Sequence, residues 1–133
     1  MDGYLRIVWA SAQRDEETLM EQSYRMGFLT GKESPIMLEA HKMSAFTVGE
    51  PFANDDVYHF GASGITHRIS EHGSVFLQHR LRPPPEEVYT LHRKLAGTYN
   101  LCIKLGSNIK CRDLLIEILR NHRFEDGLEH PLI

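Results

Sequence analysis

The sequence lacks the features that mark several large classes of protein. It has two cysteines in 133 residues, which is too few for a disulfide-based fold. No apolar run approaches the roughly 20 residues that cross a bilayer, and a formal net charge of -3 gives no basic footprint for nucleic acid. The first residues show neither a signal peptide nor a transit pattern, so we expect any targeting sequence to lie outside this chain.

Helical patterns dominate what is present, and a hydrophobic content of 41% is adequate for one core. Caps and periodicity predict about six helices. They run over residues 4–12, 15–26, 34–48, 66–79, 85–105 and 111–123. Between residues 53 and 64 the composition turns to Asn, Asp, Gly and Ser, which predicts a loop, and no strand is predicted. The fold class is therefore mostly all-α, with residues 1–133 forming a single helical domain.

Short-range signals set several ends of these helices. Asp15 is a suitable N-cap, and two glutamates follow it in the first turn. Gly27 is placed to end that helix in the left-handed conformation. Ser34 and Pro35 begin the next helix, because proline is favoured at the first helical position. The inward stripe of this helix is predicted to comprise Met37, Ala40, His41, Ser44 and Val48.

Three successive prolines set the firmest boundary in the chain. None can lie inside a helix, but Pro85 suits the first turn of a new one, and Glu86 and Glu87 follow where carboxylates stabilise the helix dipole. The helix after Pro85 is predicted to turn inward Val88, Leu91, Leu95, Thr98 and Cys102. The last helix is predicted to present Leu114, Leu115, Ile118 and Leu119.

The proline region also carries a string that resembles the C-terminal region of the UbiB-type, or aarF-domain-containing, atypical kinases, in their mitochondrial branch. Its members are Pro83, Pro84, Pro85, Glu86, Glu87, His92, Arg93 and Lys94. Two earlier stretches resemble the same family in order and spacing. They comprise Gly27, Phe28, Leu29, Thr30 and Gly31, with His41 further on, and then Gly49, Glu50, Pro51 and Phe52. Together they extend the resemblance over nearly the whole chain.

This resemblance implies that the chain is the distal helical portion of a protein-kinase-like large lobe. It implies that the parent protein binds ATP and Mg²⁺, works more as an ATPase than as a protein kinase, and supports ubiquinone biosynthesis. It also implies a mitochondrial location in association with the inner membrane. The implied partners are the catalytic lobe of the same protein, ubiquinone-biosynthesis proteins and lipid precursors.

Residues for phosphoryl transfer are not recognisable in this chain. Such a site needs a glycine-rich loop, a lysine for the phosphates and carboxylates for the metal. The stretch Phe-Gly-Ala-Ser at 60–63 imitates a metal-binding motif, but it is preceded by His59 in place of an aspartate, and we interpret it as an ordinary loop. We therefore predict no catalytic, cofactor-binding or metal-binding residue here, and expect the chain to be inactive alone.

Two groups of residues leave alternatives open. The eight histidines lack the spacing of a helical zinc site, so we expect ordinary surface or capped histidines. His41 lies on an apolar stripe, and we expect it to be buried and bonded to a backbone carbonyl. A basic group could face anionic lipid, although a solvated surface is the commoner explanation. It comprises Arg80, Arg82, Arg93 and Lys94.

Two functions remain open from the sequence. The first is a scaffolding and partner-binding segment of an atypical kinase-like ATPase, which is not catalytic by itself. The second is a free-standing helical interaction module without enzymatic activity. Coding sequence upstream of the chain would distinguish them, because only the first requires an Asp-Phe-Gly motif there.

Overall fold

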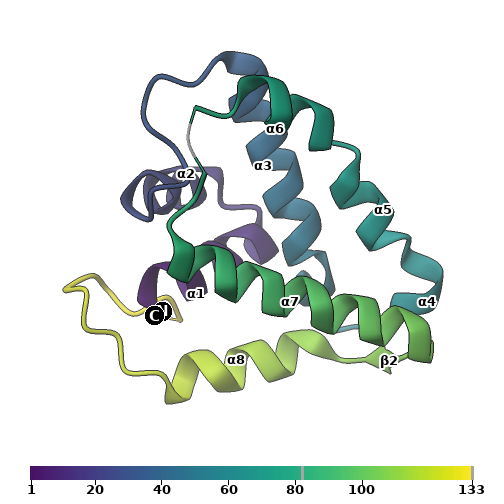
Figure 1. The fold of residues 1–133 in the computed structure, drawn as a ribbon. Helices are drawn as coiled ribbons and strands as arrows, with labels where there is room; N and C mark the ends of the chain where they lie inside the picture. The colour runs from purple at the N-terminus through teal and green to yellow at the C-terminus, as the bar shows by residue number, and fades with distance from the viewer. Residues whose placement is uncertain (82, 133) are drawn as a thin grey trace.

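The computed structural model describes residues 1–81 and 83–132 and is predominantly helical (Figure 1), which confirms the predicted fold class. The elements, in chain order, are α1 (Asp2–Gln13), α2 (Glu16–Arg25), α3 (Pro35–Gly49), the 3₁₀ helix η1 (Glu50–Phe52), β1 (Tyr58–His59), α4 (Phe60–Ser63), α5 (Ile65–Ser70), α6 (Gly73–His79), α7 (Glu86–Leu105), β2 (Asn108–Ile109) and α8 (Cys111–Asn121).

Helix α1 organises the arrangement by packing against α2, α3 and η1. On its other side α3 packs against α5 and α6, while α7 packs against α4. Figure 1 shows α4, α5 and α6 as successive short helices along one side of the molecule, with α8 running beside the long α7. Elements from the whole length of the chain thus meet around α1 and α3.

Three clusters of buried side chains form the core. The first joins α1 to α7 and α8 through Val8, Val88 and Leu119. The second gathers α3, α4, α5, α7 and the start of α8 around Phe60 and Tyr99, and the third joins α1, α2 and α3. Burial of such side chains supplies the main driving force for this packing.

The crossing of α1 and α3 depends on Gly49. A Cβ atom placed on Gly49 would lie 2.6 Å from the backbone nitrogen of Ala12 and 2.7 Å from the carbonyl carbon of Ser11. Backbone atoms cannot move aside as a flexible side chain can, so only glycine allows the two helices to approach this closely.

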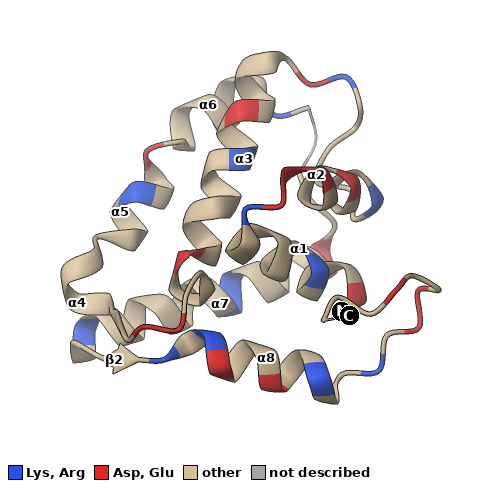
Figure 2. Ribbon diagram, turned by 180° about the vertical axis from the view of Figure 1, so that it is seen from behind, with Lys and Arg blue, Asp and Glu red and all other residues tan. Residues whose placement is uncertain are grey.

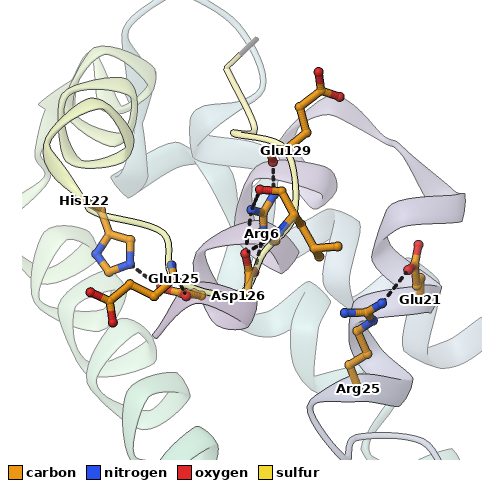
Figure 3. A network of polar contacts seen from close by, with 9 residues as sticks. Arg6, Glu21, Arg25, His122, Glu125, Asp126 and Glu129 are labelled. Carbon is orange, nitrogen blue, oxygen red and sulfur yellow. Dashed lines mark hydrogen bonds and ion pairs between the residues drawn. The ribbon is translucent and has the colours of Figure 1, made fainter.

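The C-terminal tail is held on α1 by a polar clamp, which we define as Asp2, Arg6, His122 and Asp126 (Figure 3). The buried guanidinium of Arg6 donates to both carboxylate oxygens of Asp126, at 2.7 and 3.0 Å. The carboxylate of Asp2 lies 2.6 Å from His122 Nε2 and accepts from the backbone N–H of Glu125. These bonds join residues about 120 positions apart, so the two ends of the described chain lie side by side.

Most of the predicted helix ends are confirmed. The Asp15 carboxylate accepts from the Thr18 N–H at 3.2 Å, and the Ser34 hydroxyl accepts from the Met37 N–H. Gly27 follows α2 with φ 83°. Pro85 is the N-cap of α7, with both glutamates in the first turn.

The helix predicted over residues 66–79 is wrong as a single element. It is divided into α5 and α6, because His72 adopts φ -92° and ψ 0°, outside the helical range. Gly73 then begins α6, at the position where a glycine weakens a continuous helix.

The region predicted as a loop also contains regular structure, and the expectation of no strand is wrong. Tyr58 pairs with Ile109, and His59 with Asn108, in a short antiparallel ladder. The stretch 60–63 is a helical turn in place of an ordinary loop, and its Phe60 side chain is only 1% exposed. Burial of Phe60 beneath α7 therefore gives this stretch a packing role.

Two predicted inward faces need correction. Thr98 is exposed, and the neighbouring Tyr99 is buried in its place and donates from its hydroxyl to the carbonyl of Val48 at 2.7 Å. On α8, Leu115 and Leu119 are buried as predicted, whereas two further apolar residues remain exposed. These are Leu114 and Ile118, which are 53% and 52% exposed.

Candidate functional site

A cavity of about 290 Å³ lies between α1, α3, the α5–α6 segment and the start of α7. It brings together side chains from two of the three family-like stretches of the sequence, and no residue of the stretch from Gly49 to Phe52 lines it. These are Phe28, His41, Pro84 and His92, with Arg80 of the predicted basic group. We call this the α1–α3 cavity. Its size is at the lower end of the range for small-molecule sites.

Helix α1 supplies the floor of the α1–α3 cavity. Tyr4, Ile7, Val8 and Ser11 line it, at the three- and four-residue spacing that puts side chains on one helical face. The Ser11 hydroxyl donates to the carbonyl of Ile7, so it is already satisfied. The Tyr4 hydroxyl is different, because it is buried without a hydrogen-bond partner among the described residues. Burial also raises the pKa of Tyr4 to about 12.

His41 contributes from α3, and its environment corrects the prediction of a backbone partner. Its Nε2 lies 2.8 Å from the hydroxyl of Ser23, and its ring centre lies 5.8 Å from that of Phe28. Burial lowers the pKa of His41 to about 4, with the positive charge of Arg80 acting in the same direction. His41 is therefore a neutral imidazole near pH 7.

Arg80 and His92 bring polarity to the opposite wall. The guanidinium carbon of Arg80 lies 5.0 Å from the centre of the Phe76 ring, and the side chain reaches solvent. Burial lowers the pKa of His92, and the charge of Arg80 adds to this effect. Among the described lining residues, Arg80 thus carries the formal charge and the two imidazole rings are neutral, while the nearby carboxylate of Glu33 opposes the effect of Arg80 on His41.

The predicted basic group is divided by the structure. Arg80 lines the cavity, Arg93 and Lys94 are exposed on α7, and Arg82 lies outside the described residues. Charges of both signs occur along α8 and around α2 (Figure 2).

The two earlier family-like stretches have evident packing roles. Gly27 and Gly31 have φ values of 83° and 95° and frame a turn whose Leu29 is 1% exposed. The Glu33 carboxylate accepts from Thr30 and Gly31. Burial opposes ionisation of Glu33, but these hydrogen bonds outweigh it and lower the pKa of its carboxyl.

In the stretch after α3, Pro51 is buried and Phe52 packs against the core. The Glu50 carboxylate forms a bidentate ion pair with Arg68 and accepts from the Tyr58 hydroxyl. The hydrogen bond from Arg68 lowers the pKa of Glu50. The ion pair was not predicted from the sequence. Both residues are visible there, with Arg68 lying 18 positions after Glu50 of the motif.

A second hollow of about 300 Å³, which we call the α7–α8 groove, shares Tyr4 and Val8 with the first. Among the residues that the structure describes, its lining contains no charged side chain, and it includes Leu95, Cys102 and Cys111. Leu114 and Ile118, which were exposed against expectation, also line it. The two cysteines are free and pack in the same core cluster.

Within residues 1–81 and 83–132, no group of three or more His, Cys, Asp or Glu side chains could hold a metal ion. His59 precedes the Phe-Gly-Ala-Ser stretch at 60–63, and its Nδ1 lies 2.7 Å from the side-chain oxygen of Asn108. No helix in the described part of the chain is long and apolar enough to span a membrane.

Comparison with known proteins shows that this chain is similar to proteins of one class, the atypical kinases. The chain is 44% identical over 121 residues to the mitochondrial atypical kinase COQ8 of Schizosaccharomyces pombe, covering 90% of this chain and 20% of that protein. It is 41% identical over 130 residues to the mitochondrial atypical kinase coq-8 of Caenorhabditis elegans, covering 97% and 17%. A match to atypical kinase COQ8B of Rattus norvegicus has 45% identity over 113 residues, covering 85% and 21%. No protein-family model matches the chain.

The chain belongs to the UbiB family of atypical kinases, as a segment homologous to the COQ8 proteins. This confirms the resemblance drawn from its motifs. The relatives are named as mitochondrial proteins, which confirms the expected mitochondrial location, whereas association with the inner membrane stays a prediction. The chain spans about a fifth of the length of the curated relatives that it matches.

Proposed function

We propose that this chain is a helical scaffolding segment of a COQ8-type atypical kinase and that it docks on the catalytic part of the same protein through the α7–α8 groove. Through that assembly it supports ubiquinone biosynthesis at the mitochondrial inner membrane. We assign the binding of ATP and Mg²⁺ to the catalytic part of the same protein.

The α7–α8 groove is the observation that carries this proposal. It is lined without a charged side chain, and Leu101 and Leu105 on α7 add exposed apolar surface at 56% and 72%. Apolar surface gathered in this way on a soluble protein marks an interaction site. We take the remaining four fifths of a COQ8-type protein as the occupant, because the full-length relatives are named kinases and no residues for phosphoryl transfer are recognisable in this sequence.

Association of two separately produced pieces tests the docking. The 133-residue chain is mixed with the catalytic part encoded upstream of it, and binding is measured by calorimetry. We expect Leu114→Arg combined with Ile118→Arg to weaken binding at least about 100-fold, because a hot-spot side chain contributes roughly 2 kcal/mol or more each. Leu77→Arg is the matched control, because Leu77 is 90% exposed and lines neither hollow.

Equal binding by the double variant and the control would contradict docking through this groove.

The reading frame itself gives an earlier test of the assembly. An upstream Asp-Phe-Gly motif supports the kinase segment, whereas an unrelated upstream domain would favour the free-standing interaction module.

A nucleotide titration tests the assignment of catalysis to the missing part. Phosphoryl transfer depends on positioning and charge stabilisation by a lysine, carboxylates and metal. We expect the purified chain to show no saturable Mg²⁺-ATP binding and no phosphate release above a buffer blank. Stoichiometric nucleotide binding that one substitution within this chain abolishes would overturn this assignment.

A further inference from the structure

The α1–α3 cavity is apolar over most of its wall but not uniformly so. Side chains such as Ile7, Phe28, Val48 and Ile69 provide the apolar lining. Such a lining takes an aliphatic or aromatic body, because transfer of apolar surface out of water is favourable.

One charge at the edge of the cavity has no counterpart. The Arg80 guanidinium stacks on the Phe76 ring, and no carboxylate within residues 1–81 and 83–132 pairs with it. The two nearest titratable cavity side chains, His41 and His92, carry no charge near pH 7. An anionic group at this edge would therefore meet a guanidinium free to form a bidentate pair.

A second polar group in the wall also lacks a partner. The Tyr4 side chain is 7% exposed, and its hydroxyl has no hydrogen-bond partner among the described residues. An unsatisfied buried hydroxyl costs free energy, but its oxygen is almost completely closed off from solvent, so the proposed site rests on Arg80 and the apolar lining.

We propose that the α1–α3 cavity is a binding site for a single-chain amphiphile with a monoanionic carboxylate head, such as a medium-chain fatty acid, whose head pairs with Arg80. The aliphatic chain occupies the apolar interior. The single charge of Arg80 matches one negative charge, which favours a carboxylate over a dianionic phosphate monoester. This inference does not rest on docking through the α7–α8 groove, because Arg80 lines only the α1–α3 cavity, although the two hollows share Tyr4 and Val8.

Calorimetric titration of the 133-residue chain with sodium dodecanoate, below its micelle concentration, tests the site. We expect saturable binding of one molecule per chain. Arg80→Gln should weaken it about 10- to 100-fold, the loss typical of a hydrogen bond to a charged group. Arg93→Gln, which changes an exposed arginine outside the cavity, should leave affinity unchanged.

Three comparison ligands define the head group. We expect dodecanol and dodecyltrimethylammonium to bind the native chain more weakly than dodecanoate, and the preference over dodecanol to disappear in Arg80→Gln. Tighter binding of dodecyl phosphate would overturn the choice of a carboxylate. Absence of saturable dodecanoate binding, or equal losses in Arg80→Gln and Arg93→Gln, would overturn the site.

Discussion

Two regions of helix α1 differ in how completely their polar groups are paired. In the polar clamp, Arg6 donates hydrogen bonds to the carboxylate of Asp126 and to the carbonyl of Glu129. In the α1–α3 cavity, two residues earlier on the same helix, the Tyr4 hydroxyl has no partner among the described residues. Buried polar groups are nearly always paired in a finished structure. The contrast shows that polar groups of the clamp are paired within the described chain, whereas the Tyr4 hydroxyl is buried without a partner there.

Breaking the clamp should give the largest effect on stability at neutral pH. We expect Arg6→Ala to lower the free energy of unfolding by about 1.5 to 3 kcal/mol, because it removes hydrogen bonds between a buried guanidinium and the partly exposed carboxylate of Asp126. Chemical denaturation monitored by circular dichroism measures this change.

The control for Arg6→Ala is Arg25→Ala. Arg25 forms an exposed pair with Glu21 at 3.4 Å (Figure 3), and such a pair on a helix contributes about 0.3 to 0.5 kcal/mol. Similar losses in the two variants would show that the clamp is no stronger than a surface ion pair.

Acid titration should separate the two regions by pH. The pKa of His41 is lowered to about 4, so the unfolded chain binds the proton first as pH falls below 6.5. His41 therefore stabilises the fold fully above pH 6.5, and up to about 3 kcal/mol is lost between pH 6.5 and 4. Urea denaturation across this range measures the loss, and His41→Gln should flatten it.

The clamp should lose stability only at lower pH. Hydrogen bonding to His122 lowers the pKa of Asp2, and bonding to Arg6 lowers the pKa of Asp126. Their stabilisation is present above the unfolded value near 4 and is lost as pH falls through the lowered folded values. A stability loss in His41→Gln that matches the native chain between pH 6.5 and 4 would contradict the assignment of that loss to His41, since His92 in the same cavity also has a lowered pKa.

A pair of tyrosine variants should give the smallest effects, of opposite sign. Tyr4→Phe removes a hydroxyl that is buried and unpaired, so we expect the free energy of unfolding to rise by about 1 kcal/mol. Tyr99→Phe removes the donor to the Val48 carbonyl, so we expect a fall of about 1 kcal/mol. Thermal and chemical denaturation of both variants measure the difference, and a fall in both would mean that Tyr4 has a bonding partner in solution.

Local chemistry made much of the fold predictable. Asp15, Ser34 and Pro85 each begin a helix where the sequence indicates, because capping and proline geometry act within one turn of the chain. The pairing of Tyr58 with Ile109 joins residues about 50 positions apart, and no local period reports such a contact. Thr98 and Tyr99 flank the same apolar stripe, and only the position of α3 decides which of them is buried.

The cavity could be predicted only in part. His41 and His92 were visible as motif residues, but their meeting depends on how α3 and α7 lie around α1. The sequence also does not show that the Tyr4 hydroxyl lacks a partner, because this depends on which hydrogen-bond donors and acceptors the surrounding helices place near it.

The close crossing at Gly49 has a consequence for how the binding site can vary among related proteins. Ser44, Ala45 and Val48 on α3 face Ile7, Val8 and Ser11 on α1 across the cavity, and Gly49 sets the distance between the two backbones beside them. A methyl group at residue 49 would force the helices apart and widen the cavity without altering any side chain that lines it. The ligand size that this family member accepts is thus encoded partly in a residue that never touches the ligand.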